Sequence, residues 1–298
     1  MVKVPGTDAL KTALEGASGG RRVAELVRFT RGAQSANYAG RWADGDSRFA
    51  LKLVPFERAK QYARLVDHLE KVTPGVAVRE SVPRVRFDVD GFHALVFVWC
   101  GGKPLGLEAL AGTGGVEDLV ADYRAFSATI QGVSELYPAY DYESWADEAL
   151  DSPFAIALPR DFEDVDFSLL TKDARVIHGD FQSDNLRFAG GRLAGVLDLE
   201  EFRRGSPLED FARYVCQGAD RISWWSWARY RAVLAGVERL RRATDASPEA
   251  WRAAVYGQLL WKLHKTLGKG KAGFRQALNL KWRLRKYRDL AGFTGRMR

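Results

Sequence analysis

One segment of the chain, residues 176–210, combines acidic and amide side chains at a spacing suited to chemistry on phosphates. A His-Gly-Asp triplet ends at Asp180, Asn185 follows five residues later, and Asp198 comes at the end of an apolar run. A carboxylate can orient an attacking hydroxyl group and accept its proton, which is the task that suits Asp180. Amide and carboxylate oxygens are ligands that Mg²⁺ prefers, which is the task that suits Asn185 and Asp198. The segment therefore predicts phosphoryl transfer from ATP, although each residue alone is equally typical of a turn.

Lys52 lies inside an otherwise apolar run, residues 49–54. An unpaired ammonium group is costly to bury, so a lysine there suggests a partner such as the phosphates of a nucleotide. The alternative is a lysine on the solvent side of the strand. Upstream, the turn that contains Gly32 and Ser35 offers backbone N–H groups for phosphate, but a plain hairpin connection has the same composition.

The first third of the chain has the alternation and the turn residues of a small antiparallel sheet. The pattern predicts strands over residues 23–30, 38–42, 48–54, 84–87 and 92–99. Asp44-Gly45 and Asp90-Gly91 mark the turns of two hairpins. Between the hairpins, apolar spacing predicts a helix over residues 56–72, followed by a loop.

A Gly-rich joint at residues 100–104 separates this region from one dominated by helical periodicity. Only three strand-sized runs interrupt the helices, near residues 175–177, 186–188 and 193–197. The chain is therefore predicted to be an α+β protein of two lobes. Residues 1–99 would form a β-rich N-lobe, and residues 100–298 a larger, mainly helical C-lobe that holds the predicted catalytic residues.

The composition excludes several classes of protein. A chain of 298 residues with 46% hydrophobic and 28% charged residues is typical of a globular protein. No apolar run approaches the roughly 18 residues of a membrane-spanning helix. The N-terminal residues lack the apolar core of a secretory signal, and two cysteines make no disulfide framework. We therefore expect a cytoplasmic location.

The positive charge of the chain is concentrated near its C-terminus. Residues 221–298 carry 19 Lys and Arg against 4 Asp and Glu, whereas the rest of the chain carries 26 against 34. Such a basic tail favours an anionic partner: an anionic substrate, an anionic membrane surface or nucleic acid. A solvated helical face explains the same charge equally well, and the sequence does not indicate an oligomeric state.

At these residues the chain resembles the aminoglycoside phosphotransferase and choline kinase family of small-molecule kinases. The resemblance depends on the His-Gly-Asp triplet, Asn185, Asp198 and Asp210, which is followed by Phe and Ala. Gly179 stands where protein kinases have arginine, and the Asp-Phe-Gly and Ala-Pro-Glu segments of protein kinases are absent. Small-molecule kinases are therefore the better match.

The resemblance implies a bilobal protein-kinase-like fold that uses ATP and Mg²⁺ to phosphorylate a hydroxyl group of a small molecule. It implies Asp180 as catalytic base, Asn185 and Asp198 as Mg²⁺ ligands, and Lys52 on the ATP phosphates. Adenine would bind the backbone around Val98 to Cys100.

Three points stay open in this reading. The family pairs its strand lysine with a glutamate inside the next helix, and here Glu57 and Glu70 lie near the ends of the predicted helix. Acidic residues at 141–151 would suit a cationic acceptor, whereas the basic tail favours an anionic one. A nucleotide-binding or anion-binding protein of the same fold with little transferase activity is the alternative.

Overall fold

The computed structural model describes residues 4–29, 36–56, 63, 67–69, 71, 83–111, 114–131, 139–152, 155, 158, 160–222, 226–267 and 286–291. The chain divides into two compact units. The first consists of Met1–Gly102 with Ala194–Glu200, and the second of Lys103–Leu193 with Glu201–Arg298.

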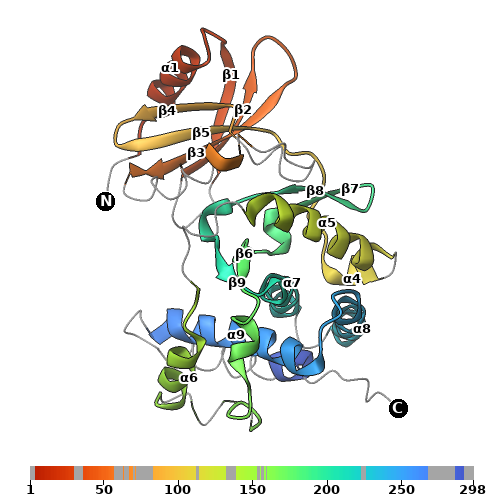
Figure 1. Cartoon of the computed structure of the whole chain (residues 1–298). Helices are drawn as coiled ribbons and strands as arrows, with labels where there is room; N and C mark the ends of the chain where they lie inside the picture. Colours follow the sequence, from red (N-terminus) through yellow and green to blue (C-terminus); the bar gives the residue numbers. More distant parts are fainter. Residues whose placement is uncertain are drawn as a thin grey trace. The chain divides into compact units, whose positions relative to one another are not determined.

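The first unit is built on a five-stranded antiparallel sheet of strand order β1-β2-β3-β5-β4 (Figure 1). Its strands are β1 (Val23–Arg28), β2 (Ala36–Trp42), β3 (Arg48–Pro55), β4 (Val85–Val89) and β5 (Phe92–Val98). Both predicted hairpins are present, since β2 pairs with β3 and β4 with β5. The sheet residues therefore agree with the alternation read from the sequence.

The turn between β4 and β5 shows why its sequence was informative. Asp90 and Gly91 both have positive φ, at 46° and 82°. Two such residues twist a hairpin turn in the same sense as its strands, and Asp-Gly tolerates this conformation best. The helix predicted over residues 56–72 is described only at residues 56, 63, 67–69 and 71, all of which are helical.

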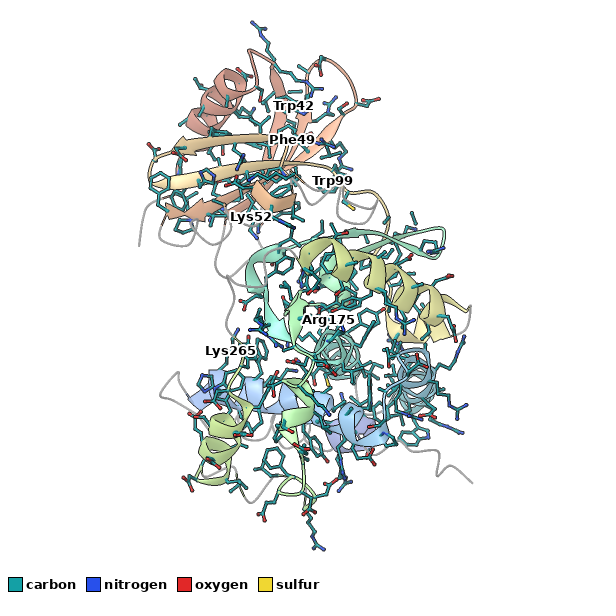
Figure 2. All side chains as sticks on the ribbon, in the orientation of Figure 1. Trp42, Phe49, Lys52, Trp99, Arg175 and Lys265 are labelled. Atoms are coloured by element: carbon teal, nitrogen blue, oxygen red, sulfur yellow. The ribbon has the colours of Figure 1, made fainter. Side chains whose placement is uncertain are left out.

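Helix α1 (Thr7–Ala17), which the sequence did not predict, lies against β1 and β4 of this sheet. Its buried Leu10 and Leu14 belong to the same core as Trp42 and Phe49, whose ring centroids are 4.6 Å apart (Figure 2). Gly40 leaves room for this packing, because a Cβ there would meet the Phe49 ring at 2.1 Å. The core fixes β3, the strand that carries Lys52.

The second unit is mainly helical. Its long helices are α5 (Gly115–Ile130), α7 (Pro207–Arg221), α8 (Trp227–Ala243) and α9 (Pro248–Leu267), and shorter ones are α4 (Leu107–Ala111) and α6 (Tyr142–Leu150) (Figure 1). Helix α9 packs against α6 and α7, and α8 packs against α4 and α5. Among the described helices, none is long and apolar enough to cross a bilayer.

Short strands frame the segment that the sequence singled out. Strand β6 (Arg175–Ile177) pairs with β9 (Arg203–Gly205), and β7 (Leu186–Ala189) pairs with β8 (Arg192–Val196). Three of the four match the predicted strands, whereas β9 was not predicted because its three residues carry no alternation. The backbones of Lys103 and Phe188 exchange two hydrogen bonds, which anchor the chain after the Gly-rich joint to β7.

A short helix at residues 286–291 closes the second unit. Its Tyr287 and Leu290 are fully buried. The ammonium group of Lys286 donates hydrogen bonds of 2.6 Å to the carbonyls of Ala219 and Ile222, where α7 ends. A cation there adds hydrogen bonds to the carbonyls at the helix end, where Ala219 also accepts from the N–H of Ile222, and it complements the helix dipole. This part of the basic tail is therefore a packed structural element, while residues 268–285 lie outside the described residues.

Candidate active site

The predicted catalytic loop follows β6 directly, and its backbone requires glycine at its second position. Gly179 has a φ of 78°, which side-chain-bearing residues rarely adopt. A Cβ at Gly179 would also lie 2.0 Å from the carbonyl oxygen of Glu201. Conformation and space thus both demand glycine, which gives a physical reason for the residue that separated this chain from protein kinases.

Asp210 braces this loop from α7. Its Oδ2 accepts hydrogen bonds of 2.7 Å from the backbone N–H of His178 and from the hydroxyl of Tyr123, and its Oδ1 accepts one of 2.8 Å from the N–H of Gly179. Burial raises the pKa of Asp210, against the opposing effect of these donors. Asp210 is not the cap of α7, because Ser206 is the N-cap of that helix.

His178 packs against the loop and supports it. Its ring is fully buried among the rings of Phe126, Phe181 and Phe202. Its Nδ1 accepts a hydrogen bond of 3.2 Å from the backbone N–H of Asp180. A ring nitrogen that accepts from an amide carries no proton, so His178 holds the loop in this arrangement rather than supplying a proton.

A buried ion pair anchors the start of α7. Glu209 accepts a hydrogen bond from the backbone N–H of Ser206, completing a capping box, and another from the hydroxyl of Tyr142. Its Oε2 lies 2.6 Å from Nη1 of Arg203, and both side chains are almost wholly buried. The guanidinium of Arg203 also lies over the ring of Tyr140, at 3.9 Å. These contacts fix α7, and with it Asp210, relative to β9.

Asp180 is surrounded by hydrogen-bond donors. Arg213 donates to its Oδ1 from Nε at 2.9 Å and from Nη2 at 2.6 Å. Gln182 and Asn185 donate to its Oδ2 at 2.8 and 3.0 Å. The Asp180 side chain is 16% exposed. The structure thus brings together Asp180 and Asn185, two of the residues predicted from the sequence.

Arg213 and Gln182 were not singled out from the sequence. Arg213 lies 33 residues from Asp180, on α7, three positions after the bracing Asp210. Residues three apart on a helix share a face, so the role of Asp210 would have placed Arg213 beside the same loop. That signal depends on knowing first that Asp210 faces the loop.

Arg213 also contacts an aromatic residue of α9. Its guanidinium lies 4.2 Å from the ring centre of Trp261, and the ammonium of Lys265 lies 4.1 Å from the same ring. Figure 2 marks Lys265 near the end of α9. The indole N–H of Trp261 donates to the hydroxyl of Tyr140 at 3.2 Å, which fixes the ring. Two cations therefore meet at one indole, next to Asp180.

A second buried polar cluster lies between α7, α9 and the final short helix. Lys262 donates to both Asp220 and Tyr287, and burial lowers the pKa of Lys262 despite the attraction of Asp220. Cys216 is fully buried nearby, and its burial raises the pKa of the thiol to about 12. The thiol is thus inert at neutral pH, which indicates a packing role.

Lys52 and Asp198 lie together in the first unit. The ammonium of Lys52, on β3, is 2.7 Å from Oδ1 of Asp198 and only 8% of the residue is exposed (Figure 2). Asp198 itself has a φ of 62°, a conformation that costs energy for any residue with a side chain. Strained backbone of this kind is concentrated at functional sites, which favours a specific role for this carboxylate.

The other predicted nucleotide-binding residues are only partly described. Val98 is 41% exposed at the end of β5, and Cys100 is buried, with its thiol 3.5 Å from the carbonyl of Gly101. Between them, the N–H of Trp99 bonds to the carbonyl of Arg48. Gly32, Ser35 and the candidate lysine partners Glu57 and Glu70 lie outside the described residues.

An amide oxygen and a carboxylate oxygen are donors of the kind that Mg²⁺ takes together with phosphates. Within the described residues, no group of three or more His, Cys, Asp or Glu side chains could form a complete metal cage. Mg²⁺ commonly needs only one or two protein oxygens, because phosphates and water supply the rest. The amide nitrogen of Asn185 donates to Asp180, so its amide oxygen points away from that carboxylate.

The acidic residues that would suit a cationic acceptor have mixed roles. Asp141 caps α6 by accepting from the N–H of Ser144, and Glu148 lies 2.7 Å from the ring of His264. A hollow of about 320 Å³ in the second unit is lined by acidic, hydroxyl and aromatic residues, Asp141 and Glu143 among them. An acidic surface therefore exists, but its best-placed carboxylates also have structural partners.

Comparison with known proteins identifies the class. The family described as "Phosphotransferase enzyme family" (APH) matches residues 25–252, and the chain belongs to this family. No curated protein sequence matches the chain.

Solved structures with the same fold are numerous. Aminoglycoside phosphotransferase APH(2'')-IIa with gentamicin is 16% identical, with a TM-score of 0.60 over 96% of this chain and 97% of that one. ADP-bound APH(2'')-Ib is 15% identical, with a TM-score of 0.57 over 94% and 98%. Macrolide 2'-phosphotransferase MphH from Brachybacterium faecium is 16% identical, with a TM-score of 0.54 over 92% and 97%. The α+β, kinase-like fold predicted from the sequence is confirmed.

Proposed function

We propose that the protein transfers the γ-phosphoryl group of ATP to a hydroxyl group of a small molecule, in a reaction that requires Mg²⁺. The observation that carries the proposal is the loop from His178 to Asn185. It presents a carboxylate and an amide side by side, on a backbone braced by Asp210. Membership of the phosphotransferase family supports this reaction class.

In the proposed step, the acceptor hydroxyl oxygen forms a bond to the γ-phosphorus, and the bond from that phosphorus to the β,γ-bridging oxygen breaks. The hydroxyl proton passes to Asp180, and ADP leaves with the electron pair of the broken bond. A carboxylate fixed on a braced loop mainly orients the hydroxyl, because the proton moves late in a loose transition state.

Lys52 would neutralise the nucleotide phosphates, and backbone around Val98 and Cys100 would bind adenine. Asn185 and Asp198 would hold Mg²⁺, which supplies positive charge to the phosphoryl oxygens. ADP-bound and ATP-bound structures among the proteins of similar fold support the choice of nucleotide. The names of those proteins, aminoglycoside and macrolide phosphotransferases, support a small-molecule acceptor.

The test compares two aspartates of one loop, Asp180→Asn and Asp184→Asn. Asp184 pairs with Arg221 on the surface, and its side chain is 55% exposed. ADP release and acceptor phosphorylation are measured over a panel of hydroxyl compounds. Asp180→Asn is expected to lose about 100-fold or more of kcat, and Asp184→Asn to stay within about threefold of the wild type.

Equal turnover by the wild type and Asp180→Asn would refute the role of Asp180. ATP binding without any phosphorylated product, in the wild type as well, would instead support the alternative of a nucleotide-binding protein. Lys52→Met and Asn185→Ala test the binding of ATP and of Mg²⁺ separately. The first is expected to weaken ATP binding, and the second to raise the Mg²⁺ concentration needed for half-maximal rate.

A further inference from the structure

The carboxylate of Asp180 has no acceptor direction left for a substrate. An ionised carboxylate accepts about four hydrogen bonds. The side chains of Arg213, Gln182 and Asn185 supply four, two on each oxygen. A hydroxyl group that is to be oriented by Asp180 must therefore displace one of these donors.

Arg213 is the donor that can leave. Asn185 is held a second time by the backbone carbonyl of Asp180, at 2.9 Å, and Gln182 belongs to the same tight loop. Arg213 comes instead from α7 on a long side chain, and it rests on the ring of Trp261. It can pivot on this ring, but a buried guanidinium needs a new anionic partner before it gives up the old one.

Several cations gather around Arg213. Arg213 on α7 pairs with Asp180, Lys262 on α9 pairs with Asp220, and Lys265 lies three positions further along α9, over the same Trp261 ring as Arg213. In the part of the chain that the structure describes, no carboxylate lies within ion-pair distance of Lys265. A phosphate or carboxylate bound at the Trp261 ring that reaches both Arg213 and Lys265 would satisfy both cations.

We propose that the acceptor carries an anionic group, a phosphate or a carboxylate, and that this group draws Arg213 from Asp180. The released oxygen of Asp180 then receives the acceptor hydroxyl. Arg213 and Lys265 are thus specificity-determining residues that couple recognition of the acceptor to release of the base. This inference rests on the proposed phosphotransferase function and names the chemical class of its acceptor.

Anion binding tests the site without any turnover. Calorimetric titration with inorganic phosphate, in saturating ADP and Mg²⁺ so that the nucleotide site is filled, compares the wild type with Arg213→Gln and Lys265→Ala. Arg239→Gln is the matched control, because Arg239 pairs with Glu117 on the surface. Both site variants are expected to weaken phosphate binding by about tenfold or more, and the control to leave it unchanged. Phosphate binding that is unchanged in Lys265→Ala and Arg213→Gln would overturn the inference. If Arg213→Gln fails to fold, phosphate binding by Lys265→Ala and Arg213→Lys is compared with that of the wild type instead.

Turnover measurements then distinguish a failure of this inference from a failure of the proposed phosphotransferase function. The panel holds one sugar frame with different charge: glucose, glucosamine, glucuronate and glucose 6-phosphate. Preference for either anionic sugar by about tenfold or more in kcat/KM supports the inference, and the better of the two identifies carboxylate or phosphate. Equal or better use of glucose or glucosamine overturns the inference while the function stands. Phosphate binding that depends on Arg213 without turnover of any compound supports the site and argues against the function.

Discussion

Asp210 accepts a hydrogen bond of 2.8 Å from the backbone N–H of Gly179, 31 residues earlier in the sequence, and this contact helps to join helix α7 to the catalytic loop. The same carboxylate holds the N–H of His178, so the loop and the helix cannot move independently. Anything that loosens Asp210 is therefore expected to disturb Asp180, although Asp210 itself reaches no substrate.

The first prediction concerns this brace. Asp210→Asn replaces one acceptor oxygen with a donor, which then faces a buried donor. We expect the free energy of unfolding to fall by about 3 kcal/mol, because buried charge-assisted hydrogen bonds contribute about 1.5–3 kcal/mol each. We also expect kcat to fall more than KM rises. Urea unfolding and steady-state kinetics measure both.

The control for this variant is Asp245→Asn. Asp245 is exposed and 3.4 Å from Arg124, and it has a φ of 59°, which asparagine tolerates. The free energy of unfolding of Asp245→Asn is expected to stay within about 0.5 kcal/mol of that of the wild type. A similar loss in the free energy of unfolding of both variants would show that the buried Asp210 contributes no more stability than an exposed carboxylate.

The second prediction separates space from backbone strain in the loop. Gly179→Ala and Gly191→Ala place alanine at similar angles, φ 78° and 81°, but only Gly179 has a neighbour that a Cβ would strike. Gly191→Ala is expected to cost about 1–2 kcal/mol. Gly179→Ala is expected to cost at least about 2 kcal/mol more, in line with other overpacked sites, and to abolish turnover.

Thermal unfolding of the two glycine variants gives this difference directly. Equal costs would mean that the carbonyl of Glu201 moves aside freely, which would remove space as the reason for glycine in the triplet.

The third prediction concerns the buried pair of Arg203 and Glu209. Arg203→Met leaves the Glu209 carboxylate buried without its cation, and we expect a loss of about 3–5 kcal/mol in the free energy of unfolding. Arg203→Met combined with Glu209→Gln removes the stranded charge, so the double variant is expected to be more stable than Arg203→Met alone. Chemical unfolding of the wild type, Arg203→Met, Glu209→Gln and the double variant measures the coupling energy of the pair.

The exposed pair of Arg239 and Glu117 is the comparison, since its atoms are 2.8 Å apart but its side chains are 38% and 56% exposed. Arg239→Met is expected to cost less than about 1 kcal/mol. If Arg203→Met costs no more than this, burial does not govern the strength of the inner pair.

The fourth prediction is a pH dependence at Cys216. Burial raises the pKa of its thiol to about 12 in the folded protein, from an ordinary value of 9.0. Above pH 9 the unfolded chain loses a proton that the folded chain retains, so rising pH stabilises the unfolded state. Between pH 7.5 and pH 10, this one group is expected to remove about 1.4 kcal/mol of stability.

Urea unfolding of Cys100→Ser, with and without Cys216→Ala, isolates the effect, because other titrating groups are common to both proteins. The protein that retains Cys216 is expected to lose more stability on going to pH 10. Parallel losses in the two proteins would contradict the assigned pKa.

The sequence was most informative where local chemistry decides structure. Asp90-Gly91 predicted its hairpin because few other residue pairs accept two positive φ angles. The spacing of Asp180 and Asn185 predicted that both belong to one functional loop, and five residues on one loop bring their side chains together. Both depend on neighbours in the chain.

Contacts between segments that are distant in the sequence could not be predicted from local patterns. Only Asp210, three residues earlier, links Arg213 to the loop of Asp180, and that link depends on how α7 packs. Lys52 is separated from Asp198 by 146 residues. Strand β9 has three residues and exists because β6 pairs with it, so its own sequence carries no strand signal.

The contact of Lys286 with the end of α7 has a consequence for biosynthesis. On the ribosome, the loop of Asp180 and then α7 emerge well before residue 286, so the last carbonyls of α7 meet their cation only after the chain up to Lys286 has been made. Tyr287, the partner of Lys262 and Asp220, follows directly. A nascent chain that has not reached Tyr287 therefore displays every residue of the catalytic loop while the helix that braces the loop still lacks these contacts at its end.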